Sequence, residues 1–167
     1  MLALLPACSS KHSNFPNSTN EQILTELQWG RNYSAVNKIL TEKFKLTYLG
    51  EEQQLPPMKV YLYSGGMYNN VPTKSWSVTF YNDSLMYIGL RVFEDSDRER
   101  ERLFTLLSEL NDKECTKDTA STADERGSNV ERRWYYGKEG KRITTILFSL
   151  PKLPKSKEFA ILMAKAY

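Results

Sequence analysis

The chain has 167 residues, of which 40% are hydrophobic and 26% charged, a composition typical of a globular protein and unlike that of disordered or coiled-coil chains. Its 23 basic and 20 acidic residues leave a formal net charge of +3, which is too small to imply a polyanionic partner for the whole molecule. No apolar run reaches the roughly 18 to 20 residues that a membrane-spanning helix needs.

Two short helices are predicted at the start of the folded part. Ser18 and Glu21 have the spacing of a capping box, in which the Ser18 hydroxyl accepts a hydrogen bond from the Glu21 amide. Apolar residues then follow at helical spacing until Gly30. A second apolar stripe with the same spacing predicts a helix from about Ser34 to Phe44.

Alternating apolar and polar residues indicate strands in the middle of the chain. The stretches "MKVYLYS", "SWSVTFY" and "SLMYIGLRVF" alternate clearly, and "KLTYL" before them does so less regularly. The turn residues Asn82, Asp83 and Ser84 predict a hairpin between the second and third of the clear strands. The stretch "SGGMYNNVPT" lacks the lysine and hydroxyl spacing of a phosphate-binding loop, so we interpret it as a turn between strands.

A third helix is predicted over "SDRERERLFTLLSEL". Ser96 and Glu99 have the spacing of a second capping box. The apolar face of this helix is expected to consist of four leucines, namely Leu103, Leu106, Leu107 and Leu110. The segment 111–129 that follows is polar almost throughout, so it predicts a mobile surface loop.

The last third of the chain predicts a second hairpin and one further element. The stretches "VERRWYY" and "KRITTILFSL" alternate and are separated by the turn "GKEG". Residues 156–167 fit either a helix or a strand, and we favour a strand because the preceding helix and hairpin need an apolar partner. We therefore expect an α+β fold at 19–167, with two N-terminal helices and one further helix packed on a mainly antiparallel sheet.

A basic and aromatic segment at 126–142 is the densest candidate for a binding surface. Aromatic side chains can stack on bases or sugars while basic side chains neutralise phosphates. The residues that would form this surface are Arg132, Arg133, Trp134, Tyr136, Lys141 and Arg142. However, Trp134 and Tyr136 lie on the same side of a strand, and we favour the interpretation that they pack into the core.

Catalytic chemistry has few candidate residues in this sequence. The single histidine, His12, lies in the N-terminal tail, so a histidine-dependent triad is not expected. Cysteine and histidine are too scarce for a zinc cluster, and we expect no metal, no cofactor and no catalytic residue. Paired carboxylates leave one alternative, a small envelope hydrolase.

The N-terminal residues Leu5-Pro6-Ala7-Cys8 resemble the lipobox of bacterial lipoproteins. The resemblance implies that Cys8 carries the lipid, palmitate included, and that the protein is exported to the cell envelope, at the outer membrane or the periplasmic face. Residues 1–7 would then be a shortened signal peptide and residues 8–18 a flexible linker behind the lipidated cysteine. Because only Met1 to Leu5 form an apolar run, we expect the true start to lie upstream; an ordinary N-terminus of a cytoplasmic protein is the alternative.

The layout of residues 20–93, two helices followed by an antiparallel meander, is similar to that of small helix-helix-sheet modules in bacterial envelope lipoproteins. This resemblance rests on layout and carries over no functional residue. We expect the chain to be a lipid-anchored envelope protein whose domain is a noncatalytic binding or scaffolding module, with an envelope protein or a glycan as a possible partner. A nucleic-acid-binding domain that uses 126–142 is a second alternative to the hydrolase. No nucleic-acid partner is expected if the chain is exported.

Overall fold

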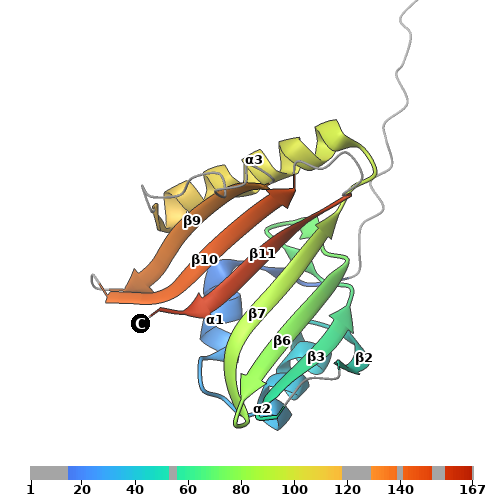
Figure 1. Cartoon of the computed structure of the whole chain (residues 1–167), viewed down its shortest axis with the longest axis vertical. Coiled ribbons are helices and arrows are strands. Elements are labelled where there is room, and N and C mark those ends of the chain that lie inside the picture. Colours follow the sequence, from blue (N-terminus) through green and yellow to red (C-terminus); the bar gives the residue numbers. More distant parts are fainter. Residues whose placement is uncertain (1–14, 53–55, 118–128, 139–140, 152–156, 167) are drawn as a thin grey trace, which may run out of the picture.

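The computed structural model of the chain describes residues 15–52, 56–117, 129–138, 141–151 and 157–166 (Figure 1). Its helices are α1 (Asn20–Leu27), α2 (Tyr33–Lys38), a π-helical continuation of α2, η1 (Ile39–Lys43), and α3 (Asp97–Glu114). A small sheet consists of β1 (Asn17–Ser18), β4 (Met67–Tyr68) and β5 (Val71–Pro72).

The main sheet has eight strands, and all its neighbouring strands are antiparallel. In spatial order they are β2 (Thr47–Glu52), β3 (Met58–Ser64), β6 (Ser75–Tyr81), β7 (Ser84–Phe93), β11 (Glu158–Lys165), β10 (Lys141–Pro151), β9 (Asn129–Lys138) and β8 (Thr116–Lys117). Three helices with a large antiparallel sheet confirm the predicted α+β class. Both predicted hairpins, β6–β7 and β9–β10, are also confirmed.

The C-terminal segment is a strand, as favoured from the sequence, and it occupies the middle of the sheet. Ala160 of β11 pairs with Arg91 of β7 on one side and with Ser149 of β10 on the other. β11 therefore joins the first four strands to the last three (Figure 1).

The hydrophobic core lies on one face of the sheet, which we call the helix-covered face. Every second residue of the central strands is buried there, for example Trp76 and Val78 in β6. Phe104 of α3 packs edge-on against Phe148 of β10, with the ring centroids 6.1 Å apart. Tyr33 of α2 stacks on Tyr61 of β3 at 3.8 Å. The helices therefore cover the same face of the sheet.

The cap of α1 lies one residue later than predicted. Thr19 is the N-cap: its hydroxyl accepts from the Gln22 amide at 3.3 Å, and the Gln22 side chain accepts from the Thr19 amide at 2.9 Å. Ser18 is buried instead in β1, where it pairs with Tyr68. For α3, Ser96 is the N-cap as predicted, but Glu99 bonds to Arg102 rather than reaching back.

The buried face of α3 agrees only in part with the predicted row of leucines, of which Leu103, Leu107 and Leu110 contact the core. Its buried residues are Arg100, Phe104, Leu107, Ser108 and Asn111, whereas Leu106 is 38% exposed. This stripe follows the spacing of successive helical turns, and the helix presents it to β9, β10 and β11. The helix also continues to Glu114 and is followed by β8, so the predicted loop at 111–129 begins too early; residues 118–128 lie outside the described residues.

The predicted turn in "SGGMYNNVPT" is confirmed, because the segment contains the β4–β5 hairpin. Gly66 has a φ of +90°, and a Cβ atom there would lie 2.6 Å from the Leu46 side chain and 2.8 Å from the Trp76 indole nitrogen. Asn69 and Asn70 at the tip also have positive φ, which asparagine tolerates better than most residues. The glycine therefore serves a close packing contact.

A buried polar network joins α1, β4 and α3. The Tyr68 hydroxyl donates to Asn20 Oδ1 at 2.7 Å, and Asn20 Nδ2 donates to Asn111 Oδ1 at 2.6 Å. All three residues are fully buried, and burial raises the pKa of the Tyr68 phenol far above its usual value of about 10. These hydrogen bonds fix the first helix against the third.

We expect Tyr68→Phe to lower the free energy of unfolding by about 1 to 3 kcal/mol, because the Asn20 carbonyl oxygen loses its buried donor. Urea denaturation monitored by circular dichroism measures the change. Tyr81→Phe is the matched control, since Tyr81 is 52% exposed, and it should change the stability by less than about 0.5 kcal/mol. Equal effects of the two substitutions would contradict the role of the network.

Candidate docking face

The face of the main sheet opposite the helices is the most distinctive surface of the described residues. We call it the open face, because none of the described helices packs on it (Figure 1). Its residues are those that alternate with the core residues along β3, β6, β7, β11, β10 and β9. The pairing registers align these residues into rows that cross the strands.

Two adjacent rows cross the centre of the open face. The first consists of Val60, Thr79, Tyr87, Ala164, Thr145 and Tyr135. The second consists of Leu62, Ser77, Gly89, Leu162, Leu147 and Arg133. The only charged member of these rows is Arg133, at the outer end in β9. A solvent-facing sheet surface usually alternates with polar and charged residues, so this uncharged band is unusual.

Large apolar side chains on this face are exposed to solvent. Tyr87 is 40% exposed, Leu162 39% and Phe93 41%. Between them the surface is low, since Gly89 has no side chain and the Ser77 hydroxyl lies over it, 2.5 Å from where a Cβ atom would be. The centre of the open face therefore combines exposed apolar groups with small residues, which suits contact with another surface.

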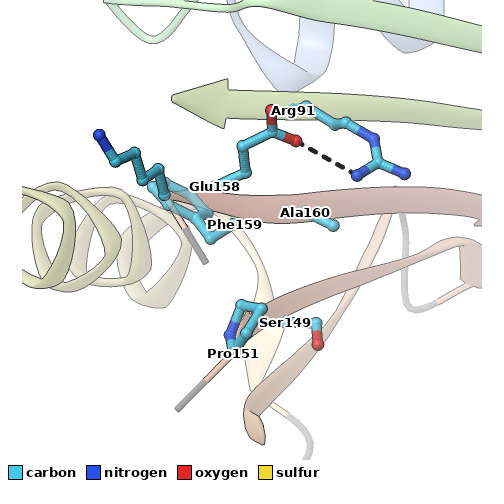
Figure 2. A pocket seen from close by; sticks show the side chains of 7 residues that line it. Arg91, Ser149, Pro151, Glu158, Phe159 and Ala160 are labelled. Atoms are coloured by element: carbon cyan, nitrogen blue, oxygen red, sulfur yellow. Dashed lines mark hydrogen bonds and ion pairs between the residues drawn. The ribbon is translucent and has the colours of Figure 1, made fainter. Parts of the chain in front are cut away.

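An open pocket of about 390 Å³ lies at one corner of this face. Its lining residues come from β7, β10, β11 and the residue before β11, and they are Arg91, Ser149, Pro151, Lys157, Glu158, Phe159 and Ala160. Figure 2 shows the Glu158 carboxylate bonded to Arg91, with Ser149 and Pro151 on the neighbouring strand beyond Ala160. The pocket is thus built across the three central strands.

The ion pairs in the pocket centre on the Glu158 carboxylate. It forms an ion pair with Lys74 and another with Arg91, the latter at 3.2 Å. The hydrogen bond from Lys74 is the main cause that lowers the pKa of the Glu158 carboxyl, and Arg91 lowers it further. Glu158 is the single carboxylate in the lining, so the pocket does not supply the pair of acids that the hydrolase alternative requires. A general acid would need a raised pKa.

The predicted basic and aromatic surface at 126–142 is divided between the two faces of the sheet. Trp134 is completely buried, and its indole nitrogen donates to Asp112 at 2.8 Å, which confirms the core interpretation. Tyr136 lies on the same side and is partly buried against the core. Arg132 also lies on that side, with its guanidinium 5.4 Å from the Phe104 ring centre.

Arg133 is the one predicted basic residue whose described side chain lies on the open face, since it neighbours Leu147 there. The side chains of Lys141 and Arg142 lie outside the described part of the structure. The nucleic-acid alternative requires these basic residues to line one exposed surface. Arg132 and Arg133 lie on opposite faces of the sheet, so they do not.

The described residues also show how far the remaining reactive or metal-binding side chains could support chemistry. Burial raises the pKa of the Cys115 thiol to about 12, which disfavours the reactive thiolate. Within the described ranges, no group of three or more histidine, cysteine, aspartate or glutamate residues is arranged to hold a metal ion, and no helix is long and apolar enough to cross a membrane. Cys8, the predicted lipidation site, lies outside the described residues.

The exposed edge strand β2 is a weaker candidate for docking than the open face. Its pairing with β3 is irregular between Tyr48 and Gly50, and the strand continues with Glu51 and Glu52. Bulges and charges on an edge strand disfavour the addition of another strand. The centre of the open face is not an edge, and its two rows carry one charged residue, Arg133 at their outer end.

We expect Glu158→Gln to reduce the free energy of unfolding at neutral pH by about 0.5 to 1 kcal/mol, since the ion pairs are partly exposed. The folded state lowers the pKa of Glu158, so this stabilisation is present above the unfolded-state pKa of about 4.3 and is lost as the pH falls through the lower folded-state pKa. Urea denaturation between neutral and strongly acidic pH should show the two proteins converging in acid.

The control for this experiment is Glu109→Gln, because Glu109 is an exposed carboxylate on α3, away from the sheet. This variant should keep the acid-dependent loss of stability seen in the unmodified protein. A constant difference between Glu158→Gln and the unmodified protein at every pH would show that the ion pairs do not stabilise the fold.

No protein-family model, curated protein or solved structure matches this chain.

Proposed function

We propose that the chain is a noncatalytic docking module of the cell envelope, anchored by lipid at Cys8, that binds protein through the open face. The observation that carries the docking proposal is the uncharged central band of that face, with exposed Tyr87 and Leu162. Contiguous apolar surface on a folded protein is commonly a site of protein contact. Transferring this band from water to an interface desolvates no charged side chain at its centre.

The anchor proposal rests on the sequence Leu5-Pro6-Ala7-Cys8 and its resemblance to a lipobox. The polar residues that follow Cys8 have the composition of a tether between an anchor and a domain. About ten such residues reach roughly 15 to 20 Å on average, similar to the radius of a domain of this size. A lipid at Cys8 would therefore keep the docking module close to the membrane surface.

To test docking, a photo-crosslinking amino acid such as p-benzoylphenylalanine replaces Leu162 in the full chain expressed in its source cells. We expect ultraviolet irradiation to give a defined protein adduct, because Leu162 lies at the centre of the open face. The same replacement at Leu106 is the matched control, since Leu106 is equally exposed but lies on α3. Adducts that form equally from both positions, or from neither, would refute docking through the open face.

To test the anchor, the gene is expressed with its upstream codons in the presence of labelled palmitate. We expect the label on the unmodified chain and its complete loss in Cys8→Ser, with the variant leaving the membrane fraction. Cys115→Ser is the control and should keep both the label and the fractionation. An unlabelled parent chain would contradict the anchor and leave the docking proposal standing.

A further inference from the structure

The two central strands of the open face have complementary shapes. The outward residues of β7 alternate large, small, large, in the order Tyr87, Gly89 and Arg91. Their direct partners on β11 alternate in the opposite sense, as Ala164, Leu162 and Ala160. Each large side chain thus lies beside a small residue on the neighbouring strand.

This pattern makes the face complementary to itself. A twofold axis that lies in the interface, parallel to the strands and between β7 and β11, exchanges these two strands. It places Leu162 of one copy over Gly89 of the other, because these residues pair at the same height along the strands. By the same rotation, Tyr87 lies over Ala164. Interdigitation of this kind is how two sheets pack face to face.

Charged side chains also lie near the axis, beside the two central rows. Arg91 is on β7 and Glu158 is on β11, and they already pair at 3.2 Å within one chain. Exchange of the two strands brings each Arg91 towards the β11 of the other copy, near that copy's Glu158. It also places the two Arg91 side chains about one strand spacing apart, so dimer formation requires the Glu158 carboxylates to offset this repulsion. The same operation brings no two like charges together in the two uncharged rows.

The open face is large enough for a stable dimer. In spatial order the open face consists of the six strands β3, β6, β7, β11, β10 and β9. Its width across these strands is roughly 29 Å at the usual strand spacing, and its length along seven residues of strand is roughly 23 Å. The product is roughly 650 Å² per copy, or roughly 1,300 Å² for both, within the range of standard protein interfaces.

We propose that the open face binds the open face of a second copy of this chain, around a twofold axis parallel to the strands between β7 and β11. This inference rests on the proposed docking function and names its partner. Such an interface is isologous, so both copies use the same residues and the assembly closes as a dimer.

The proposal is tested by sedimentation of the full chain carrying Cys8→Ser, a substitution that removes the lipid and one thiol. The oligomeric state is measured at protein concentrations from about 1 to about 300 μM. We expect a concentration-dependent dimer. Leu162→Lys and Leu162→Glu should each weaken the dimer at least about tenfold, because each places two like charges about one strand spacing apart across the axis. An equal mixture of the two variants should recover the dimer through opposite charges.

Leu106→Lys is the matched control, with the same substitution at a residue of the same exposure on α3, and it should leave dimerisation within about twofold. Tyr87→Lys is a second open-face variant with the same expected loss. Circular dichroism and thermal unfolding establish that each variant is folded. If Leu162→Lys is unfolded, Tyr87→Lys decides the outcome.

A monomer at every concentration, a dimer that survives a folded open-face variant, or equal loss with Leu106→Lys would overturn the inference. The photo-crosslinking experiment separates this failure from failure of docking itself. An adduct from Leu162 to a different protein, together with a monomeric chain, would refute the second copy but support docking. The absence of both self-association and any adduct from Leu162 would refute both.

Discussion

The pairing of β11 with both β7 and β10 is the constraint on which the rest of the structure depends. Without the last strand, the sheet would separate into a four-stranded part and a three-stranded part, each with an additional unpaired edge. Residues near 160 must find partners near 90, so a long loop has to close before these hydrogen bonds form. This closure also makes the core continuous across the centre of the sheet, because Ile161 lies between Leu90 and Phe148.

The described helices lie on one side of this sheet, and this has consequences for the distribution of charge. On the helical side, the outer surface of α3 carries the charged residues Arg98, Glu101, Arg102 and Glu109. The centre of the open face carries threonine, serine, alanine, leucine and tyrosine instead. The two central rows of the open face therefore hold one charged residue, Arg133 at their outer end, while Arg91 and Glu158 lie beside them.

Local patterns in the sequence predicted most of the helices and strands. The strand order and the orientation of α3 were not predicted, because they depend on contacts between residues far apart in the chain. Alternation in "SWSVTFY" was sufficient to place Trp76, Val78 and Phe80 in the core, since a strand needs only a period of two. The position of β11 was not predictable, because strand order depends on partners that are distant in sequence. Leu106 was misassigned for the same reason: the direction in which α3 faces is set by β9, β10 and β11, and that contact buries Arg100 instead.

The open face illustrates the same limit at the level of the candidate site. Each strand's outward residues could be read from the sequence, but their rows appear only when six strands are set in register. The sequence predicts one surface at 126–142 because its basic and aromatic residues are close together in the chain. In the structure, Arg132 and Arg133 point to opposite faces of β9. Consecutive side chains in a strand point to opposite faces of the sheet. Gly89 and Leu162 are far apart in the chain but are paired neighbours on the same face.

The two proposals reinforce each other energetically. A face of modest area with an uncharged centre and few large side chains gives limited affinity in dilute solution, because association must offset lost translational and rotational freedom. A lipid anchor removes part of that cost by confining both copies to a thin layer at the membrane, where the effective concentration of each for the other is raised. Under this arrangement a weak contact in solution becomes substantial at the membrane. The anchor at Cys8 and the complementary pattern of β7 and β11 would then serve one purpose, which is to assemble the module where it is tethered.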